Sequence, residues 1–115
     1  IMISNHGGRQ LDGIPAPVER VSSMRNAVGD KIELIVDGGI RRGTHILKAL
    51  ALGANAVSIG RPYLYGLAAN GELGVQKVLT LLNDELRRDM ALLGCKNLSE
   101  VTNKHVRSIH DKRNE

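Results

Sequence analysis

The 115-residue sequence is poor in aromatic residues: it has no Trp, no Phe and only two Tyr, Tyr63 and Tyr65. Proteins that bind single-stranded nucleic acids stack the bases on aromatic side chains, and the basic residues here are scattered along the chain rather than clustered. The net charge of +4 therefore does not indicate a nucleic-acid-binding protein. Arginines that bind an anionic cofactor and substrate explain this charge more economically.

Cysteine and long apolar runs are also scarce. Cys95 is the only cysteine, so it cannot form a disulfide within the chain, and without a neighbouring His or Cys we expect a structural thiol. His105 and His110 have no further ligand at metal spacing, which predicts no metal site. No apolar run approaches the ~20 residues of a membrane-spanning helix, and no signal peptide or peroxisomal Ser-Lys-Leu terminus is visible. A cytoplasmic protein is therefore expected.

Three short apolar segments alternate with amphipathic ones along the chain. We expect strands at residues 1–4, 32–36 and 56–59, and helices from near Pro17 to residue 28, at 44–52, as a brief turn at 63–69, and at 73–93. The first strand begins abruptly at Ile1, so we expect that its start and the true N-terminus are missing. Strands this uniformly apolar lack a solvated face, which predicts a parallel sheet covered by helices.

The spacing between the strand ends indicates a particular α/β architecture. His6 lies 31 positions before Asp37, and Asp37 lies 23 positions before Gly60. Repeats of this size are typical of the βα units of a TIM (β/α)8 barrel, whose active site lies at the C-terminal ends of the strands. We assign residues 1–94 to such units and residues 95–115 to a polar C-terminal tail of the same domain.

The tetrad His6-Gly7-Gly8-Arg9 directly follows the first strand. A glycine pair lets the backbone turn sharply and approach a flat ligand, with the flanking His and Arg at the mouth of the site. His6 can accept a proton from a hydroxyl near neutral pH, and the Arg9 guanidinium matches a carboxylate. The pair suits a substrate that carries both groups. Taken alone, such a His-x-x-Arg pattern is more often only structural, with the His capping a turn and the Arg in a surface ion pair.

Glycine and arginine recur at the next two strand ends, from Asp37 to Gly43 and at Gly60-Arg61. Exposed backbone N–H groups and the start of the following helix can hold a phosphate there, while an Arg supplies countercharge. Glycine pairs also end strands for steric reasons alone. Two such loops in successive units, each with an Arg, favour the phosphate site that recurs in the last loops of (β/α)8 barrels.

The order and spacing of these motifs resemble one family. Ser-Asn-His-Gly-Gly-Arg-Gln-Leu-Asp at 4–12, the loop at 37–43, Ala-Leu-Ala-Leu-Gly-Ala at 49–54 and Gly-Arg-Pro at 60–62 resemble the C-terminal part of the FMN-dependent 2-hydroxy acid dehydrogenases and oxidases. That family includes glycolate oxidase, L-lactate oxidase, L-lactate and mandelate dehydrogenases and flavocytochrome b2. The resemblance implies about the last three βα units of a TIM barrel that binds FMN.

Position by position, the resemblance implies a role for each motif residue. His6 matches the active-site base, and Arg9 matches the residue that binds the substrate carboxylate. Ser4 lies where the strand passes the flavin, and Asp37 matches a residue that hydrogen-bonds the ribityl chain. The two phosphate-binding loops consist of Gly38, Gly39, Ile40, Arg41, Gly60 and Arg61.

The reaction implied by the resemblance is oxidation of a small L-2-hydroxy acid, such as lactate or glycolate, to the 2-keto acid. Oxygen, a quinone or another acceptor then takes the electrons from reduced FMN. His6 removes a proton while Arg9 holds the carboxylate, as a hydride or a carbanion step, and a carboxylate and a lysine from earlier strands assist. A homo-oligomer, commonly a tetramer, is expected. The alternatives are another FMN- or phosphate-binding barrel enzyme, which would lack the His-Gly-Gly-Arg tetrad, and a truncated fragment without activity.

Several polar residues outside these motifs are assigned no chemistry. We expect Thr44 to cap the second helix and His45 to lie on its solvated face. Arg42 is expected to be only a surface neighbour of the phosphate loop. Glu85 and the charged residues up to Asp89 are expected to be solvated or to pair across a subunit contact.

Overall fold

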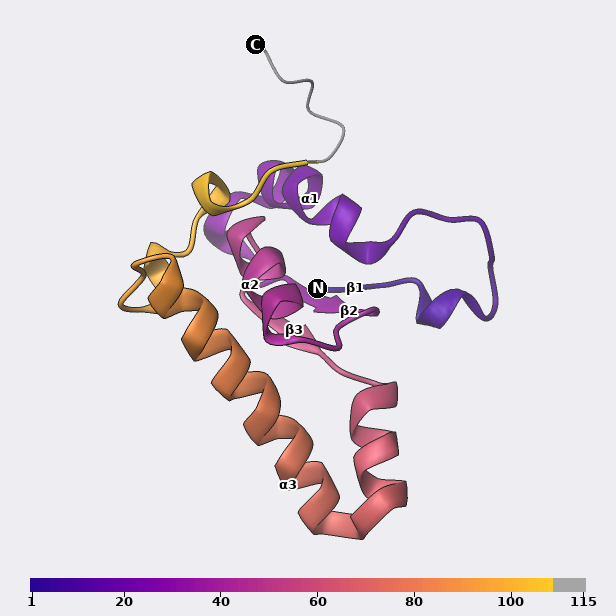
Figure 1. Ribbon diagram of the computed structural model, residues 1–115. Coiled ribbons are helices and arrows are strands. Elements are labelled where there is room, and N and C mark those ends of the chain that lie inside the picture. Colours follow the sequence, from indigo (N-terminus) through magenta and orange to yellow (C-terminus); the bar gives the residue numbers. More distant parts are fainter. Residues whose placement is uncertain (109–115) are drawn as a thin grey trace.

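The computed structural model describes residues 1–108 and shows a three-stranded parallel sheet with helices (Figure 1). The strands, in the spatial order β1-β2-β3, are β1 (Met2–Ser4), β2 (Ile35–Asp37) and β3 (Ala56–Ser58). The longer helices are α1 (Val21–Val28), α2 (Gly43–Ala51) and α3 (Arg61–Leu92). The short 3-10 helices of the described part are η1 (His6–Gly8), η2 (Pro17–Arg20), η3 (Gly29–Lys31), η4 (Leu98–Glu100) and η5 (Asn103–His105). The predicted α/β fold with a parallel sheet is confirmed.

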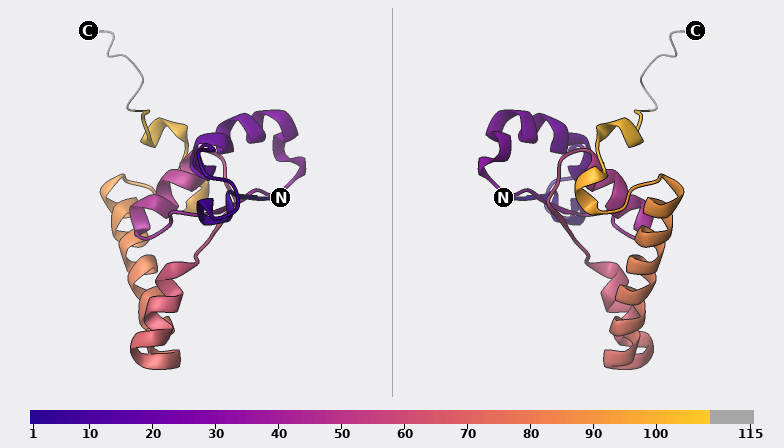
Figure 2. Two further views of the ribbon diagram at one scale, coloured as in Figure 1. Left: turned by 90° about the vertical axis from the view of Figure 1, so that its right-hand side faces the viewer. Right: turned by 90° about the vertical axis from the view of Figure 1, so that its left-hand side faces the viewer.

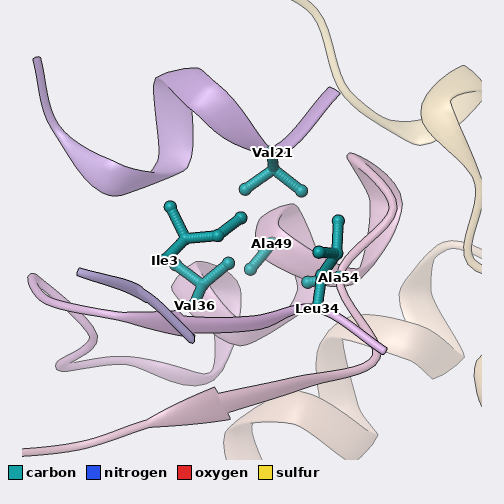
Figure 3. Close-up of a cluster of buried hydrophobic side chains, with 6 residues drawn as sticks. All are labelled: Ile3, Val21, Leu34, Val36, Ala49 and Ala54. Atoms are coloured by element: carbon teal, nitrogen blue, oxygen red, sulfur yellow. The ribbon is translucent and has the colours of Figure 1, made fainter. Parts of the chain in front are cut away.

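One face of the sheet packs against α1 and α2. The middle residues of the strands, Ile3, Val36 and Val57, pair in register. Because side chains alternate along a strand, these three point to the same face. Ile3 and Val36 lie close to Val21 of α1 and Ala49 of α2 (Figure 3), and Val57 packs against the same cluster. The buried cluster that results consists of Ile3, Val21, Leu34, Val36, Ala49 and Ala54.

The opposite face of the sheet is left open in the described part of the chain. Met2, Ile35 and Ala56 pair in register on this face. Met2 is 56% exposed, Ala56 is exposed and Ile35 is half-buried. The strands are therefore apolar on both faces, as the sequence predicts, but only one face is covered by helices.

Helix α3 forms a hairpin that extends away from the sheet and returns to contact α2 (Figures 1 and 2). Its direction changes at Asn70 and Gly71, which have non-helical backbone angles. The brief turn and the long helix expected from the sequence are thus the two arms of α3. No helix among residues 1–108 is both long and apolar enough to span a membrane.

The segment after α3 packs back onto the body of the chain. Cys95 and Val101 are buried in a second cluster with residues of α2 and α3, namely Leu47, Ala51 and Met90. The Sγ atom of Cys95 lies 3.5 Å from Nε2 of His105, a contact that the sequence did not predict. His110 lies outside the described residues.

Candidate active site

The last residues of the three strands form one polar row at the carboxyl edge of the sheet. Ser4 pairs in register with Asp37, and Asp37 pairs with Ser58. The Ser4 hydroxyl donates a hydrogen bond to Oδ2 of Asp37 at 2.6 Å. Ser58 was not among the predicted site residues, although it ends an apolar strand, as Ser4 and Asp37 do.

The loop after β1 contains a left-handed turn. The φ angles of His6, Gly7 and Gly8 are 53°, 68° and 72°, a region that glycine adopts freely and other residues rarely enter. The His6 N–H donates to Oγ of Ser4 at 3.0 Å, and the Gly7 N–H donates to Oδ1 of Asn5 at 3.1 Å. The sharp turn predicted from the glycine pair is confirmed.

The His6 and Arg9 side chains are both exposed on this loop. Nδ1 of His6 is hydrogen-bonded to Oε1 of Gln10. An amide oxygen only accepts, so this contact fits the tautomer with its proton on Nδ1, in which Nε2 is the acceptor. Among residues 1–108, no carboxylate forms an ion pair with Arg9. Its guanidinium is therefore available to an anion.

A cleft of about 320 Å³ opens at the carboxyl edge of the sheet. It brings together residues from all three strand-end loops. Nine predicted site residues line it: His6, Arg9, Asp37, Gly38, Gly39, Ile40, Arg41, Gly60 and Arg61. Ser4 does not line the cleft but lies behind Asp37, to which it is bonded. The residues of the lining that the sequence did not predict are Gly7, Ser58, Pro62 and Leu64.

Two successive glycines with positive φ angles form the start of the loop after β2. Gly38 and Gly39 have φ angles of 119° and 76°. A Cβ atom at Gly38 would lie 3.4 Å from Cγ of Pro17 and 3.5 Å from Oδ1 of Asn5, whereas one at Gly39 would meet nothing within 4 Å. The backbone at Gly39 is thus open to a ligand in the cleft.

The loop after β3 leads directly into α3. Gly60, Arg61 and Pro62 line the cleft, and α3 begins at Arg61, so its first turn adjoins the cleft. The first N–H groups of a helix have no partner within the helix. With Arg41 on the neighbouring loop, this donor set fits the phosphate of a nucleotide such as FMN. No group of three or more His, Cys, Asp or Glu in residues 1–108 is placed to hold a metal ion.

Helix α2 begins without a cap from its own side chains, so the prediction that Thr44 caps it is wrong. The Gly43 N–H instead donates to Oε2 of Glu85 on α3 at 2.7 Å. Nε of Arg42 donates to both carboxylate oxygens of Glu85, at 2.9 and 3.0 Å, and Nη2 of Arg42 lies 2.8 Å from Oε1. Glu85 is therefore neither free in solvent nor reserved for a subunit contact, and Arg42 is its ion-pair partner.

This ion pair changes the titration of both groups. The hydrogen bond from Arg42, reinforced by the one from the Gly43 N–H, lowers the pKa of Glu85 below its ordinary value of 4.5. The same side-chain bond raises the pKa of Arg42. His45, expected to be solvated, is half-buried, and its Nδ1 accepts the Arg41 N–H at 3.2 Å.

Comparison with known proteins identifies the family. Residues 1–108 match the model of the FMN-dependent dehydrogenase family. The chain is 50% identical over 112 residues to peroxisomal (S)-2-hydroxyacid oxidase GLO3 of Arabidopsis thaliana and 52% identical over 107 residues to 2-hydroxyacid oxidase 1 of Homo sapiens. These matches cover 97% and 93% of this chain but only 31% and 29% of the relatives. The chain thus spans about three tenths of their length.

Solved structures give the same answer. Mandelate oxidase with 3,3-difluoro-2-hydroxy-3-phenylpropionic acid superposes with a TM-score of 0.86 at 48% identity, over 90% of this chain and 31% of that one. The monotopic membrane protein (S)-mandelate dehydrogenase superposes with a TM-score of 0.87 at 45% identity, over 92% and 28%. The resemblance carried by the strand-end motifs is confirmed, and the chain belongs to the FMN-dependent dehydrogenase family.

Proposed function

We propose that this chain is the C-terminal part of an enzyme that uses FMN to oxidise a small L-2-hydroxy acid, of the lactate or glycolate type, to the 2-keto acid. The observation that carries the proposal is the cleft in which His6 and Arg9 face the two glycine-arginine loops. The cleft combines a base, a cation for a carboxylate and a phosphate site. The names of the relatives, 2-hydroxyacid oxidase and mandelate oxidase, support the same substrate class.

The proposed architecture is about the last three βα units of a TIM (β/α)8 barrel, with residues 1–94 as the units and residues 95–115 as the tail of the same domain. In such a barrel, helices cover the outside of the sheet and side chains fill the inside. The open face with Met2, Ile35 and Ala56 fits the inner surface, since apolar residues occupy it in register.

In this proposal each predicted site residue has a separate role in binding or proton transfer. Arg9 binds the substrate carboxylate through two parallel hydrogen bonds, and Nε2 of His6 accepts a proton from the substrate. FMN, when bound, supplies the acceptor for the two electrons that leave the substrate. Asp37, with Ser4 behind it, binds the ribityl hydroxyls. The phosphate is held by the loop residues Gly38, Gly39, Ile40, Arg41, Gly60 and Arg61.

Three further properties of the whole protein stay predictions. The final electron acceptor is oxygen, a quinone or another molecule, and kinetics with each acceptor distinguish them. A homo-oligomer, tetrameric by resemblance, is tested by size-exclusion chromatography of the full-length protein. A cytoplasmic location is tested by cell fractionation, with peroxisomes as the competing compartment, because two relatives from Arabidopsis thaliana are named peroxisomal.

The decisive experiment uses the full-length protein that contains this chain. Anaerobic addition of L-lactate or glycolate bleaches the flavin absorbance. His6→Ala leaves FMN bound, because His6 is outside the phosphate loops, but slows bleaching by on the order of 10²- to 10⁴-fold, as expected for loss of a general base. Bleaching at the wild-type rate in this variant would remove His6 from the role of base. A wild-type protein that no small 2-hydroxy acid bleaches would contradict the proposed activity.

A further inference from the structure

We infer that Glu85 of α3 is a positioning residue for FMN binding: it fixes the phosphate-binding loop at residues 38–41 without touching the phosphate. The inference rests on the proposed function, since it assumes that this loop and Gly60-Arg61 bind one FMN phosphate. Glu85 is not part of the cleft lining. Its contacts reach the loop from the side of α3.

The Glu85 carboxylate binds the two residues that directly follow the loop. Its oxygens accept the Gly43 N–H and the Arg42 guanidinium at 2.7 to 3.0 Å. The preceding residue, Arg41, lines the cleft, and its N–H is bonded to Nδ1 of His45 on α2. Each residue from Arg41 to Gly43 therefore has a hydrogen bond to a side chain of α2 or α3, which connects the end of the loop to both helices.

The backbone at Gly43 also lies directly against α3. A Cβ atom there would lie 2.3 Å from the backbone nitrogen of Leu86 and 2.6 Å from the carbonyl carbon of Glu85. It would also lie 2.5 Å from the Cβ of Glu85, so the two helices leave no space for a further side-chain atom at this point. The Glu85 carboxylate therefore binds Arg42 and Gly43 where the two helices are in direct contact, next to the end of the loop.

Helix α3 connects the two phosphate loops. It begins at Arg61, in the second loop, turns at Asn70 and Gly71, and returns to α2 with Glu85 on its second arm (Figures 1 and 2). The first arm of α3 therefore begins in the second loop, and the second arm is hydrogen-bonded through Glu85 to the residues that follow the first loop. A single phosphate held by both loops needs their separation fixed to within about 0.5 Å, and Glu85 supplies that link.

The test compares FMN with riboflavin, which is the same flavin without the phosphate. In the full-length protein, we expect Glu85→Ala to raise the Kd for FMN by about tenfold, the low end of the loss seen when a residue that orients metal ligands is removed. The Kd for riboflavin is expected to stay unchanged. Both constants are measured by quenching of flavin fluorescence in titrations of the apoprotein.

Two further variants and a control sharpen the comparison. Arg42→Ala removes the ion pair but leaves the bond from Glu85 to the Gly43 N–H, so its FMN Kd should lie between wild type and Glu85→Ala. Glu85→Gln keeps one acceptor oxygen for the hydrogen bonds but loses the negative charge of the carboxylate. Glu72→Ala removes an exposed carboxylate on the same helix, which accepts a hydrogen bond from Gln76 within α3, and should leave both constants unchanged.

The outcomes separate this inference from the proposed function. An unchanged FMN Kd in Glu85→Ala, or an equal weakening of FMN and riboflavin, overturns the positioning role, because the second result shows an effect on folding alone. If Glu85→Ala does not fold, Glu85→Gln and Arg42→Ala are judged by the same two criteria. A wild-type protein that does not bind FMN contradicts the proposed function itself, and the inference falls with it.

Discussion

The side chains that would meet a hydroxy acid stand on a turn that few residue types can form. His6, Gly7 and Gly8 have consecutive positive φ angles, a conformation that costs a non-glycine residue such as His6 energy. The turn is held by the bonds from the His6 N–H to Ser4 and from the Gly7 N–H to Asn5. Backbone strain of this kind concentrates where a side chain must be aimed. The turn therefore determines how the imidazole and the Arg9 guanidinium face the cleft.

Replacing Arg9 by lysine should chiefly weaken substrate binding. An ammonium is a point charge and cannot reproduce the two parallel hydrogen bonds of a guanidinium to a carboxylate, and losing one charge-assisted bond is worth on the order of tenfold in KM. Steady-state kinetics of the full-length protein measure the effect, with kcat expected to change less than KM. Arg20→Lys, on the exposed η2 segment outside the cleft lining, is the matched control. A fall in kcat with an unchanged KM would contradict this role.

The residues proposed to react with the substrate could be identified from the sequence because they are neighbours in it. His6 and Arg9 flank a glycine pair, and the conformation of that pair follows from local chemistry. Ser58 was missed because a serine at a strand end carries no distinctive pattern by itself. Glu85 was missed for a different reason: its partners Arg42 and Gly43 lie more than 40 positions earlier, and only the folded chain brings them together.

At the scale of elements, the contact between α2 and α3 should be intolerant of a side chain. Gly43→Ala places a Cβ atom 2.3 Å from the Leu86 backbone nitrogen, so the helices must move apart, at a cost of about 1–3 kcal/mol typical of overpacking. Urea unfolding of the full-length protein measures the loss. Thr44→Ala, one position later, should change stability by less than about 0.5 kcal/mol, because Thr44 makes no capping bond. Equal losses in the two variants would show that the close approach is unimportant.

The ion pair between these elements predicts a pH dependence of stability. The hydrogen bond from Arg42 lowers the pKa of Glu85 in the folded protein below the ordinary value of 4.5. A depressed carboxyl pKa adds stability above the unfolded value, and this contribution disappears as the pH falls through the lower, folded value. Wild type should therefore melt at a higher temperature than Glu85→Gln at about pH 6, and the gap should close towards about pH 3. If the difference in melting temperature between wild type and Glu85→Gln persists at about pH 3, the titration of Glu85 is not its cause.

Local periodicity was sufficient to predict the order of the strands and helices, although β2 begins at Ile35 and not at residue 32 and α1 begins only at Val21. It did not explain how α2 begins. The apolar runs and glycine turns gave the order of elements and the break of α3 at residues 70–71. The cap of α2 was assigned to Thr44 because Thr is a frequent capping residue. The orphan N–H is instead satisfied by Glu85, since α3 lies close enough to supply a carboxylate.

At the scale of the whole molecule, the described chain is an open assembly. Strands β1 and β3 each have one unpaired edge, one face of the sheet is uncovered, and large apolar residues such as Tyr65 and Leu92 are 69% and 80% exposed. The radius of gyration is 15.2 Å, against about 13 Å for a compact domain of this size. These features suit a part that is completed by further βα units.

The isolated 115-residue chain should therefore neither bind FMN tightly nor turn over. Unpaired edges and an uncovered apolar face favour aggregation over autonomous folding. FMN binding is measured by titrating the purified chain with FMN, and turnover by an oxidation assay with lactate or glycolate. The full-length protein serves as the positive control in both. Measurable oxidation by the chain alone would overturn the expectation and show that the cleft is complete without the rest of a barrel.

The register of the strands also limits where this polypeptide can change in length. Side chains alternate along a strand, so one extra residue between Leu34 and Asp37 would turn the Asp37 carboxylate towards α1 and bring a valine to the ligand. The connection at residues 11–16 is exposed throughout and does not line the cleft, so an insertion there disturbs neither the sheet nor the helices that cover it. The chain can therefore tolerate extra residues between the turn at His6–Gly8 and η2, whereas the number of residues in each short strand must stay the same.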